Sequence, residues 1–299
     1  MAGSIYVIHV PDLGGTSWEG VSSQSLSRSV SVSRPIADGN VWPGIAAITS
    51  DTATFSATGF DIAGGLAISG LNGADLSNVI VYGAKMAAAG AKAGSTVHVS
   101  HTMAKAYVVP RRLTASQGGN ATLTLDTIGY STTGASPVAS ATGVSLSADV
   151  GGASALYTLG PIEVAGTAYS NHMSVDVDFG VGVTVLACDG DVGSKLVVTT
   201  AAAPTVTVST YDQATAAAID DGLAASGDGV EIWFRLRSET GFASGSVHGK
   251  LTAANGILVP LGVTGSAGGA LQYSYRLDTY DDGANANPLV WSGSAALPT

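Results

Sequence analysis

The sequence predicts an all-β protein made of two tandem, similar β-sandwich or barrel domains, each with one short flanking helix. Three observations carry this prediction. The chain repeats itself at an offset of about 150 residues, apolar and polar residues alternate with a period of two over many short segments, and 40 glycines punctuate those segments. A repeat this long indicates a duplicated domain and not a solenoid, because each half is large enough to bury its own core.

The repeat is clearest between residues 97–130 and residues 247–280. At an offset of 150, 11 of these 34 positions are identical, where about three would match by chance in a composition so rich in a few residue types. Upstream of this unit the best offset is 151, so one residue is gained or lost between about 68 and 97. The two domains are therefore predicted at residues 1–150 and 151–299. The identical positions of the first copy are Val97, His98, Thr102, Ala104, Val109, Pro110, Thr114, Ser116, Gly118, Gly119 and Tyr130.

Alternating segments place the strands in chain order. The repeated unit closes each half as two strands joined at a Gly-Gly turn, and Gly180 and Gly182 predict a bend or bulge within their strand. Further strands are expected at 4–10, 21–34, 44–49, 52–58 and 78–83 in the first half, and at 174–186, 195–200, 205–210 and 229–237 in the second.

Each half also carries one candidate helix. In residues 214–225, Ile219 and Leu223 lie one turn apart, and Thr210 and Gln213 have the spacing of a capping box. The counterpart in the first half begins at Asp61 but holds two glycines, which predicts a shorter or frayed helix. Trp18 aligns with Tyr169 across the repeat, so a structural role is expected for an aromatic residue there.

Charge is scarce and acidic. Only 11% of residues are charged, and 22 acids against 12 bases give a net charge of −10. Scarce charge predicts that much of the surface is covered by other protein, and the acidic balance disfavours tight nucleic-acid binding. The single cysteine, Cys188, excludes an internal disulfide and is expected to be buried. No signal peptide or membrane span is predicted.

No catalytic, cofactor or metal site is predicted, and an enzyme is not expected. His98 and His101 would lie on opposite faces of a strand, and the recurrence of His98 as His248 favours a structural role. Asp176 and Asp178 share one strand face, either as an acid/base pair or, more simply, as an acidic solvent-facing surface.

Two other polar groups have simple interpretations. Asp189-Gly190-Asp191 and Asp281-Asp282-Gly283 resemble fragments of calcium loops but lack the full ligand series, so they are expected to be ordinary turns. The basic pair Arg111-Arg112 departs from the repeat, which indicates either a subunit contact or neutral drift.

The closing unit of the second half resembles the C-terminal hairpin region of tail tube proteins from tailed bacteriophages. The resemblance rests on turn residues and alternation: Gly256-Ile257-Leu258-Val259-Pro260, Thr264, Gly268-Gly269, Tyr273-Ser274-Tyr275, Tyr280-Asp281-Asp282-Gly283 and Asn287-Pro288-Leu289. It implies a β-sandwich or barrel with a flanking helix, six copies of which form a ring around a DNA channel. Some long-tailed phages carry two fused copies of that domain, so that three chains form a pseudo-sixfold ring, and this duplicated sequence would suit that arrangement.

The function expected from the resemblance is that of a virion structural protein. Its partners would be further copies of itself in stacked trimeric rings and other tail proteins, and it would be assembled in the host cytoplasm. DNA would pass through without specific binding, and Asp176 and Asp178 are candidate lumen-facing acids. Replacing both by Lys would slow DNA passage and leave assembly intact.

The alternative is another structural or adhesive β protein, such as a capsid decoration, a tail spike or a surface sugar-binding module. Sugar binding would need an exposed aromatic platform, yet Trp42, Trp233 and Trp291 are scattered along the sequence. Independently of any resemblance, a fused duplicate with few charges suits symmetric assembly, because subunit pairing satisfies strand edges that a monomer would expose.

Overall fold

A computed structural model of the chain describes most of its length. The described residues are 5–36, 41–87, 91–94, 96–147, 155–164, 166–169, 171–188, 190–212, 229–238, 241–265, 267, 269–281 and 287–298. Within these ranges no helix has the length and apolar character needed to cross a membrane.

Strands are the main secondary structure of the described residues, which contain one helix, and this confirms the predicted all-β class. In the first half the elements are β1 (Tyr6–Ile8), β2 (Asp12–Leu13), β3 (Thr16–Ser17), β4 (Val21–Ser33), β5 (Ala47–Gly59), α1 (Ile62–Ser69), β6 (Ala74–Leu76), β7 (Val79–Lys85), β8 (His98–Met103), β9 (Lys105–Ser116), β10 (Thr122–Tyr130) and β11 (Val138–Val144). In the second half they are β12 (Tyr157–Val164), β13 (Thr167–Tyr169), β14 (His172–Asp178), β15 (Val181–Leu186), β16 (Leu196–Ala202), β17 (Thr205–Thr210), β18 (Val230–Ser238), β19 (Gly241–Phe242), β20 (His248–Ala253), β21 (Gly256–Thr264), β22 (Gln272–Thr279) and β23 (Leu289–Ala295).

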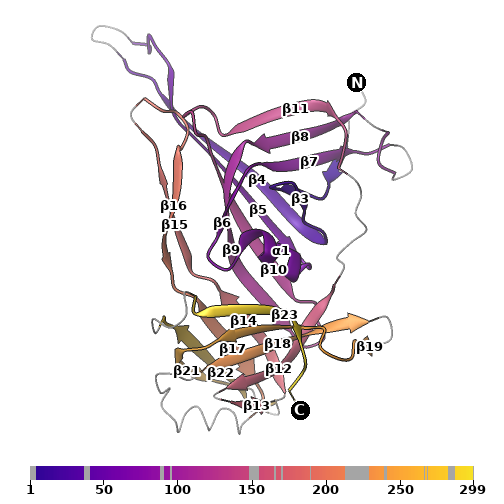
Figure 1. Ribbon diagram of the computed structural model, residues 1–299. Helices are drawn as coiled ribbons and strands as arrows, with labels where there is room; N and C mark the ends of the chain where they lie inside the picture. Colours follow the sequence, from indigo (N-terminus) through magenta and orange to yellow (C-terminus); the bar gives the residue numbers. More distant parts are fainter. Residues whose placement is uncertain are drawn as a thin grey trace.

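One long sheet spans both halves. Its strand order is β21-β22-β17-β14-β9-β10-β5-β4, with β6 added on β9. Each half packs a smaller sheet against it, in the order β11-β8-β7-β2-β3 in the first half and β13-β12-β18-β20-β23 in the second. In Figure 1 these smaller sheets lie at opposite ends of the molecule, and the long sheet runs between them. A continuous apolar core lies between the layers and includes Phe55, Leu113, Val177, Val206 and Phe234.

The strand pairing of the first half recurs in the second at offsets of 150 or 151. The sheet order β9-β10-β5-β4 matches β21-β22-β17-β14, and β11-β8-β7-β2-β3 matches β23-β20-β18-β12-β13. The registers agree residue by residue. Corresponding pairs are Ser25↔Ser56 with Asp176↔Thr207, Thr124↔Arg112 with Ser274↔Gly262, and Val79↔Met103 with Val230↔Ala253.

Irregularities of pairing recur as well. The β9–β10 ladder shifts register at Thr124/Leu125, and β21–β22 shifts at the equivalent point, Pro260/Gly262. A bulge is a local insertion that bends a strand, so its repetition in both halves is hard to obtain by coincidence. The two-domain division itself stays a prediction, and its boundary at 150/151 lies outside the described residues.

Some element predictions need correction. Residues 44–49 and 52–58 were expected as two strands, but β5 is a single strand, because its long antiparallel ladder with β4 holds residues 47–59 extended together. Cys188 is exposed and not buried, since it follows the outer end of β15, where Val185 and Leu186 are exposed as well. The predicted bend at Gly180 is confirmed, because β14 ends at Asp178 and Gly180 has a φ of 57°. The predicted helix at 214–225 lies outside the described residues.

Helix α1 is short, and its glycines allow close packing. Asp61 caps it by accepting the Gly64 N–H at 3.0 Å, and the Trp18 indole donates to the Asp61 carbonyl at 2.9 Å. A Cβ on Gly65 would lie 2.6 Å from Leu123 and 3.0 Å from Trp18. Trp18 and Leu123 are fully buried, so the helix can seat on the core only where its surface lacks a side chain. This confirms the structural role expected for Trp18.

Gly65→Ala is expected to lower the free energy of unfolding by about 1–3 kcal/mol. The added methyl group would overpack the contact with Leu123 and Trp18, which outweighs the better helix propensity of alanine. Denaturant melts of purified protein would measure the change. The matched control is Gly44→Ala, because a Cβ there meets nothing within 4 Å. Equal stability of the two variants would contradict the packing role.

His172 occupies a bulge that the first half also has, where Val21 is its counterpart. It is 5% exposed, and burial lowers its pKa from 6.5 to about 4. The folded state therefore keeps the imidazole neutral over a range in which the unfolded chain binds a proton. Stability is complete above pH 6.5 and falls as pH drops from about 6.5 to about 4, because the unfolded state then holds more protons.

The parent protein is expected to lose up to about 3 kcal/mol of unfolding free energy between pH 6.5 and pH 4 because of His172, and His172→Val should abolish that loss. Valine is the residue that the first half uses at this point, so the strand geometry should persist. Denaturant melts at pH 7, 5.5 and 4 would compare the variant with the parent. A parallel pH dependence in both proteins would show that His172 is not the titrating group.

Candidate functional site

The long sheet has one buried face and one polar face, set by the alternation of its strands. Inward-pointing residues such as Phe55, Leu125 and Val208 are buried, while their neighbours in sequence are half-buried or exposed. We call the outward side the hydroxyl face, because serine and threonine dominate it. Registers across the sheet place these hydroxyls on one side: Ser23, Ser25, Ser27, Ser29, Thr52, Thr54, Ser56, Thr58, Thr114, Thr122, Thr124, Ser174, Thr205, Thr207, Ser209 and Ser274.

Neighbouring hydroxyls bond to one another across strands. Thr58 and Thr124 are joined at 3.0 Å, and Ser209 and Ser274 at 3.1 Å. Such pairs use part of each hydroxyl's bonding capacity and carry no net charge. The hydroxyl face can therefore hydrogen-bond to water, but it holds few groups that could bind a charged ligand firmly.

Each arginine on the hydroxyl face is paired with an aspartate. Arg111 donates to Asp126 at 2.9 Å, and Arg276 donates through two nitrogens to Asp278, at 2.6 and 2.8 Å. Arg112 forms a two-pronged pair with Asp176, with Nε to Oδ1 at 2.7 Å. The Asp176 carboxylate raises the pKa of Arg112. Bidentate geometry occupies the donors that a phosphate would otherwise use.

Asp176 and Asp178 do share one strand face, as the sequence predicts. Neither is a free acid, however, since Asp176 holds Arg112 and Asp178 accepts the Gly180 N–H at 2.9 Å. Together with Asp126 and Asp278, these acids lie beside three arginines, so the ion pairs on this face leave little net charge. Most of the chain's acidic excess thus lies elsewhere.

The Arg112–Asp176 pair joins the two halves. β9 of the first half and β14 of the second are adjacent strands, with Leu113 opposite Val177 and Thr114 opposite Asp176. The basic pair that departs from the repeat therefore stabilises a contact within the chain. Sequence reasoning could not find this contact, because no local pattern links residues 64 positions apart.

The β9–β10 turn also docks on the second half. The Ala121 N–H donates to the Tyr157 carbonyl at 2.7 Å, and the Thr158 hydroxyl donates to the Gly119 carbonyl at 2.7 Å. The Arg237 guanidinium donates to the Gly118 carbonyl at 2.7 Å. We call this contact the internal seam: residues 112–121 against Tyr157–Thr158 and Ser174–Asp178. Leu113, Ala121 and Val177 are fully buried in it.

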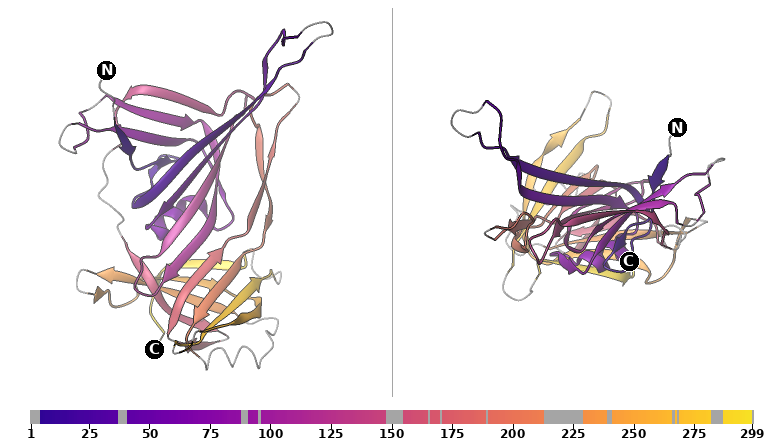
Figure 2. Two further views of the ribbon diagram at one scale, coloured as in Figure 1. Left: turned by 180° about the vertical axis from the view of Figure 1, so that it is seen from behind. Right: turned by 90° about the horizontal axis from the view of Figure 1, so that it is seen from above.

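The β15–β16 hairpin extends the internal seam. It runs alongside the first half in both side views (Figures 1 and 2). Arg111 donates to the Val181 carbonyl at 2.8 Å, and the hydroxyls of Tyr107 and Thr199 are 2.7 Å apart. Val181 is 1% exposed and belongs to the apolar core.

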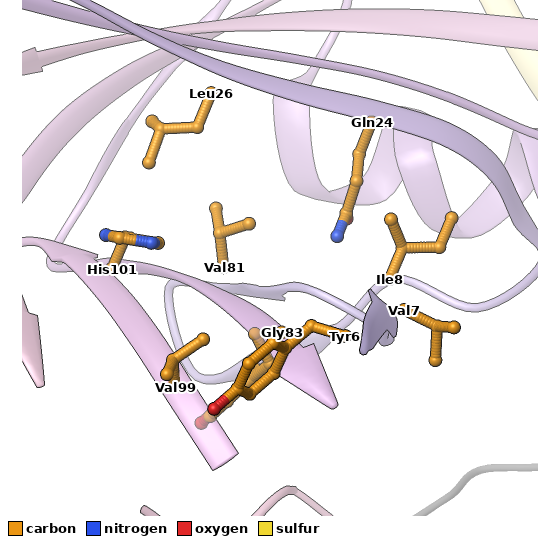
Figure 3. Close-up of a pocket in the computed structure, with 10 residues that line it drawn as sticks. Tyr6, Val7, Ile8, Gln24, Leu26, Val81, Gly83, Val99 and His101 are labelled. Atoms are coloured by element: carbon orange, nitrogen blue, oxygen red, sulfur yellow. The ribbon is translucent and has the colours of Figure 1, made fainter. Parts of the chain in front are cut away.

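A cavity of about 250 Å³ opens in the first half, between the small sheet and the outer strand β4. Figure 3 shows Leu26, Gln24 and Ile8 around one side of it, with Val81 and His101 facing them and Tyr6 below. Its lining is mainly apolar and contains no cluster of acids, bases or nucleophiles. Nothing in the sequence marked this cavity as a site.

The histidines have structural roles. His98 Nδ1 accepts the Lys85 N–H at 3.0 Å, and His248 Nδ1 accepts the Leu236 N–H at 3.1 Å, so the same bond recurs in both halves. His101 lies on the opposite face and bonds Ser140 at 2.8 Å. Within the described residues no three His, Cys, Asp or Glu side chains gather as metal ligands. The Asp-Gly turns at 189–191 and 281–283 lie partly outside those residues.

Asp176→Lys is expected to lower the free energy of unfolding by about 0.5–1 kcal/mol, because it replaces the pair with Arg112 by like-charge repulsion at the internal seam. This revises the expectation that lysines at 176 and 178 would leave assembly untouched. The matched control is Ser25→Lys, at the equivalent position of β4, where the strand edge is free. Denaturant melts would compare the two, and similar losses would argue against a role for the ion pair.

No protein-family model matches this chain, and no curated protein shows significant similarity to it.

Proposed function

We propose that this chain is a virion structural protein, a tail tube subunit that assembles head to tail into rings around a DNA channel. The observation that carries the proposal is the long sheet. Its two outer strands, β21 and β4, are the counterparts of β9 and β14, which pair inside the chain. A contact of β21 with β4 of the next copy would therefore repeat the internal seam.

A head-to-tail contact gives either a closed ring or an open filament, depending on its rotation. Two similar halves per chain make each ring position nearly equivalent, so a rotation that suits six positions is satisfied by three chains. Trimeric, pseudo-sixfold rings are the closed assembly that the resemblance to duplicated tail tube proteins implies. The role is structural and not catalytic, and its place is the virion, with assembly in the host cytoplasm and no membrane involved.

The hydroxyl face supports a conduit role, because it is the face of the long sheet that the core leaves open. DNA binds proteins mainly through lysine and arginine contacts with phosphates, and each such contact adds affinity. Here Arg111, Arg112 and Arg276 are each held by an aspartate. A channel lined in this way would let a polyanion slide, because neutral hydroxyls hydrogen-bond weakly and interchangeably with water.

An adhesive or sugar-binding role is less well supported. Trp18 and Trp233 are buried, while Trp42 is 80% exposed. The described residues next to Trp42 in the sequence include no other aromatic residue. A sugar platform needs an aromatic face with convergent polar partners, and within the described residues no second aromatic ring packs beside Trp42.

The purified chain is expected to form trimers that appear as rings with a central pore. Light scattering coupled to size exclusion would give three chains per particle, and negative-stain microscopy would show the ring. Titrating labelled duplex DNA at 150 mM salt should give no saturable binding. Rings of six chains, a chain that stays monomeric at high concentration, or tight DNA binding would each contradict the proposal.

A further inference from the structure

The cavity beside β4 has a filled counterpart in the second half. Tyr6, Leu26 and Val81 line the cavity, and the repeat places Tyr157, Val177 and Ile232 at the same positions. These three counterparts are at most 4% exposed. In the first half Val81 is buried as well, at 8%, but Leu26 is half-buried and Tyr6 is 43% exposed. The same architecture is therefore closed in one half and open in the other.

Two differences account for the closure in the second half. The first is the internal seam itself, in which the β9–β10 turn covers Tyr157. The second is side-chain volume, because Phe234 and Trp291 occupy the positions held by Gly83 and Ser140 in the first half. The Phe234 and Trp291 rings lie 5.7 Å apart, and Trp291 contacts Tyr157 edge-on at 6.3 Å.

The β9–β10 turn, which covers Tyr157, has its counterpart in the β21–β22 hairpin at the other end of the long sheet. Leu113 and Ala121 of the internal seam are 0% exposed, but their equivalents on β21 and its turn, Val263 and Leu271, are 52% and 53% exposed. Isolated apolar residues on a surface are ordinary. Here they lie at the two positions that the internal seam buries completely.

The two free surfaces are complementary in size. In the internal seam a small residue, Ala121, bonds to Tyr157, which packs against Trp291 and, through it, near Phe234. The free ends offer a larger residue, Leu271, and positions where Gly83 and Ser140 leave more space. A leucine side chain can occupy a cavity of this size, and burying it releases apolar surface from water.

We propose that β21 of a second copy of this chain adds to β4 in antiparallel register, with Val263 opposite Leu26 and Thr264 opposite Ser25. Leu271 of that copy then enters the cavity, and its N–H donates to the Tyr6 carbonyl, as Ala121 does to Tyr157. This interface rests on the head-to-tail assembly proposed above, but it specifies a register that neither the ring nor its channel requires.

A disulfide experiment tests the register. In a Cys188→Ser background, Ser25→Cys and Thr264→Cys are combined, because the two positions would face each other across the new ladder, within disulfide reach. Mild oxidation should give covalent dimers and trimers on non-reducing gels. The control combines Ser29→Cys with Thr264→Cys, which shifts one partner four residues along the same strand and face, and it should give none.

The outcomes separate the interface from the function. Rings without the specific crosslink would overturn the interface and leave the proposed function standing. Specific crosslinks in particles that are not closed rings would support the interface and overturn the tube. Equal crosslinking in both double variants would overturn the register.

A second measurement tests the cavity. Leu271→Asp should weaken self-association at least about 10-fold, since it would place a carboxylate in an apolar space. Val290→Asp is the matched control, because Val290 is 52% exposed on β23, away from both free edges, and it should change association less than about twofold. Mass photometry across a dilution series reads out both, with circular dichroism to check folding. Wild-type association of Leu271→Asp would overturn the proposal.

Discussion

The structure depends on how its sheet edges are satisfied. An exposed edge presents unpaired N–H and C=O groups that invite another strand, and proteins usually blunt such edges with charges, prolines or bulges. Inside this chain the problem is solved by pairing β9 with β14, which turns two four-stranded ladders into one sheet. The same step leaves β4 and β21 at the ends. β4 is long and has a single charge, Arg28, among serines and small apolar residues, so it has little protection of its own. β21 carries Pro260 and a bulge, but its apolar residues are exposed.

Much of the fold could be predicted, because a repeat places the same residues in the same local contacts. The offsets of 150 and 151 anticipate the paired registers, and the alternation of Val and Leu with polar residues anticipates which face of β14 or β17 is buried. The predictions fail where distant segments decide the outcome. The joining of β9 to β14 has no local signal, so Arg112 and Asp176 could be placed on strands but not beside each other. Likewise β5 continues through residue 51 because β4 pairs along its whole length.

The scarcity of charge also finds a physical explanation. All twelve basic residues lie in the described part of the chain, and the three arginines on the hydroxyl face are held by aspartates. Elsewhere Arg28 donates to Asp51 through two nitrogens, at 2.8 and 2.6 Å, and this pairing lowers the pKa of the Asp51 carboxyl from its usual value. Most of the surface that a soluble monomer would cover with lysine and glutamate is here serine, threonine and small apolar residues. Such a surface costs little to desolvate, and that favours contact between copies over contact with water or a polyanion.

The two halves differ at the positions that would distinguish the contact within one chain, β9 with β14, from the proposed contact between copies, β21 with β4. A contact within one chain benefits from the high effective concentration of tethered segments, whereas a contact between copies must also offset the lost freedom of association. The larger Leu271 and the emptier cavity fit that requirement, because in the proposed interface they would bury more apolar surface between copies. The same differences penalise mistaken pairing. β9 placed on the β4 of another copy would leave a void beside Ala121 and separate Arg112 from Asp176, while β21 placed on β14 would force Leu271 against Phe234 and Trp291. Voids and overpacking each cost stability. The differences between the halves would therefore disfavour contacts between two first halves or two second halves, and the halves would alternate around a ring. Specificity for the correct contact would then come from the poor packing of the wrong contacts as well as from the good packing of the correct one.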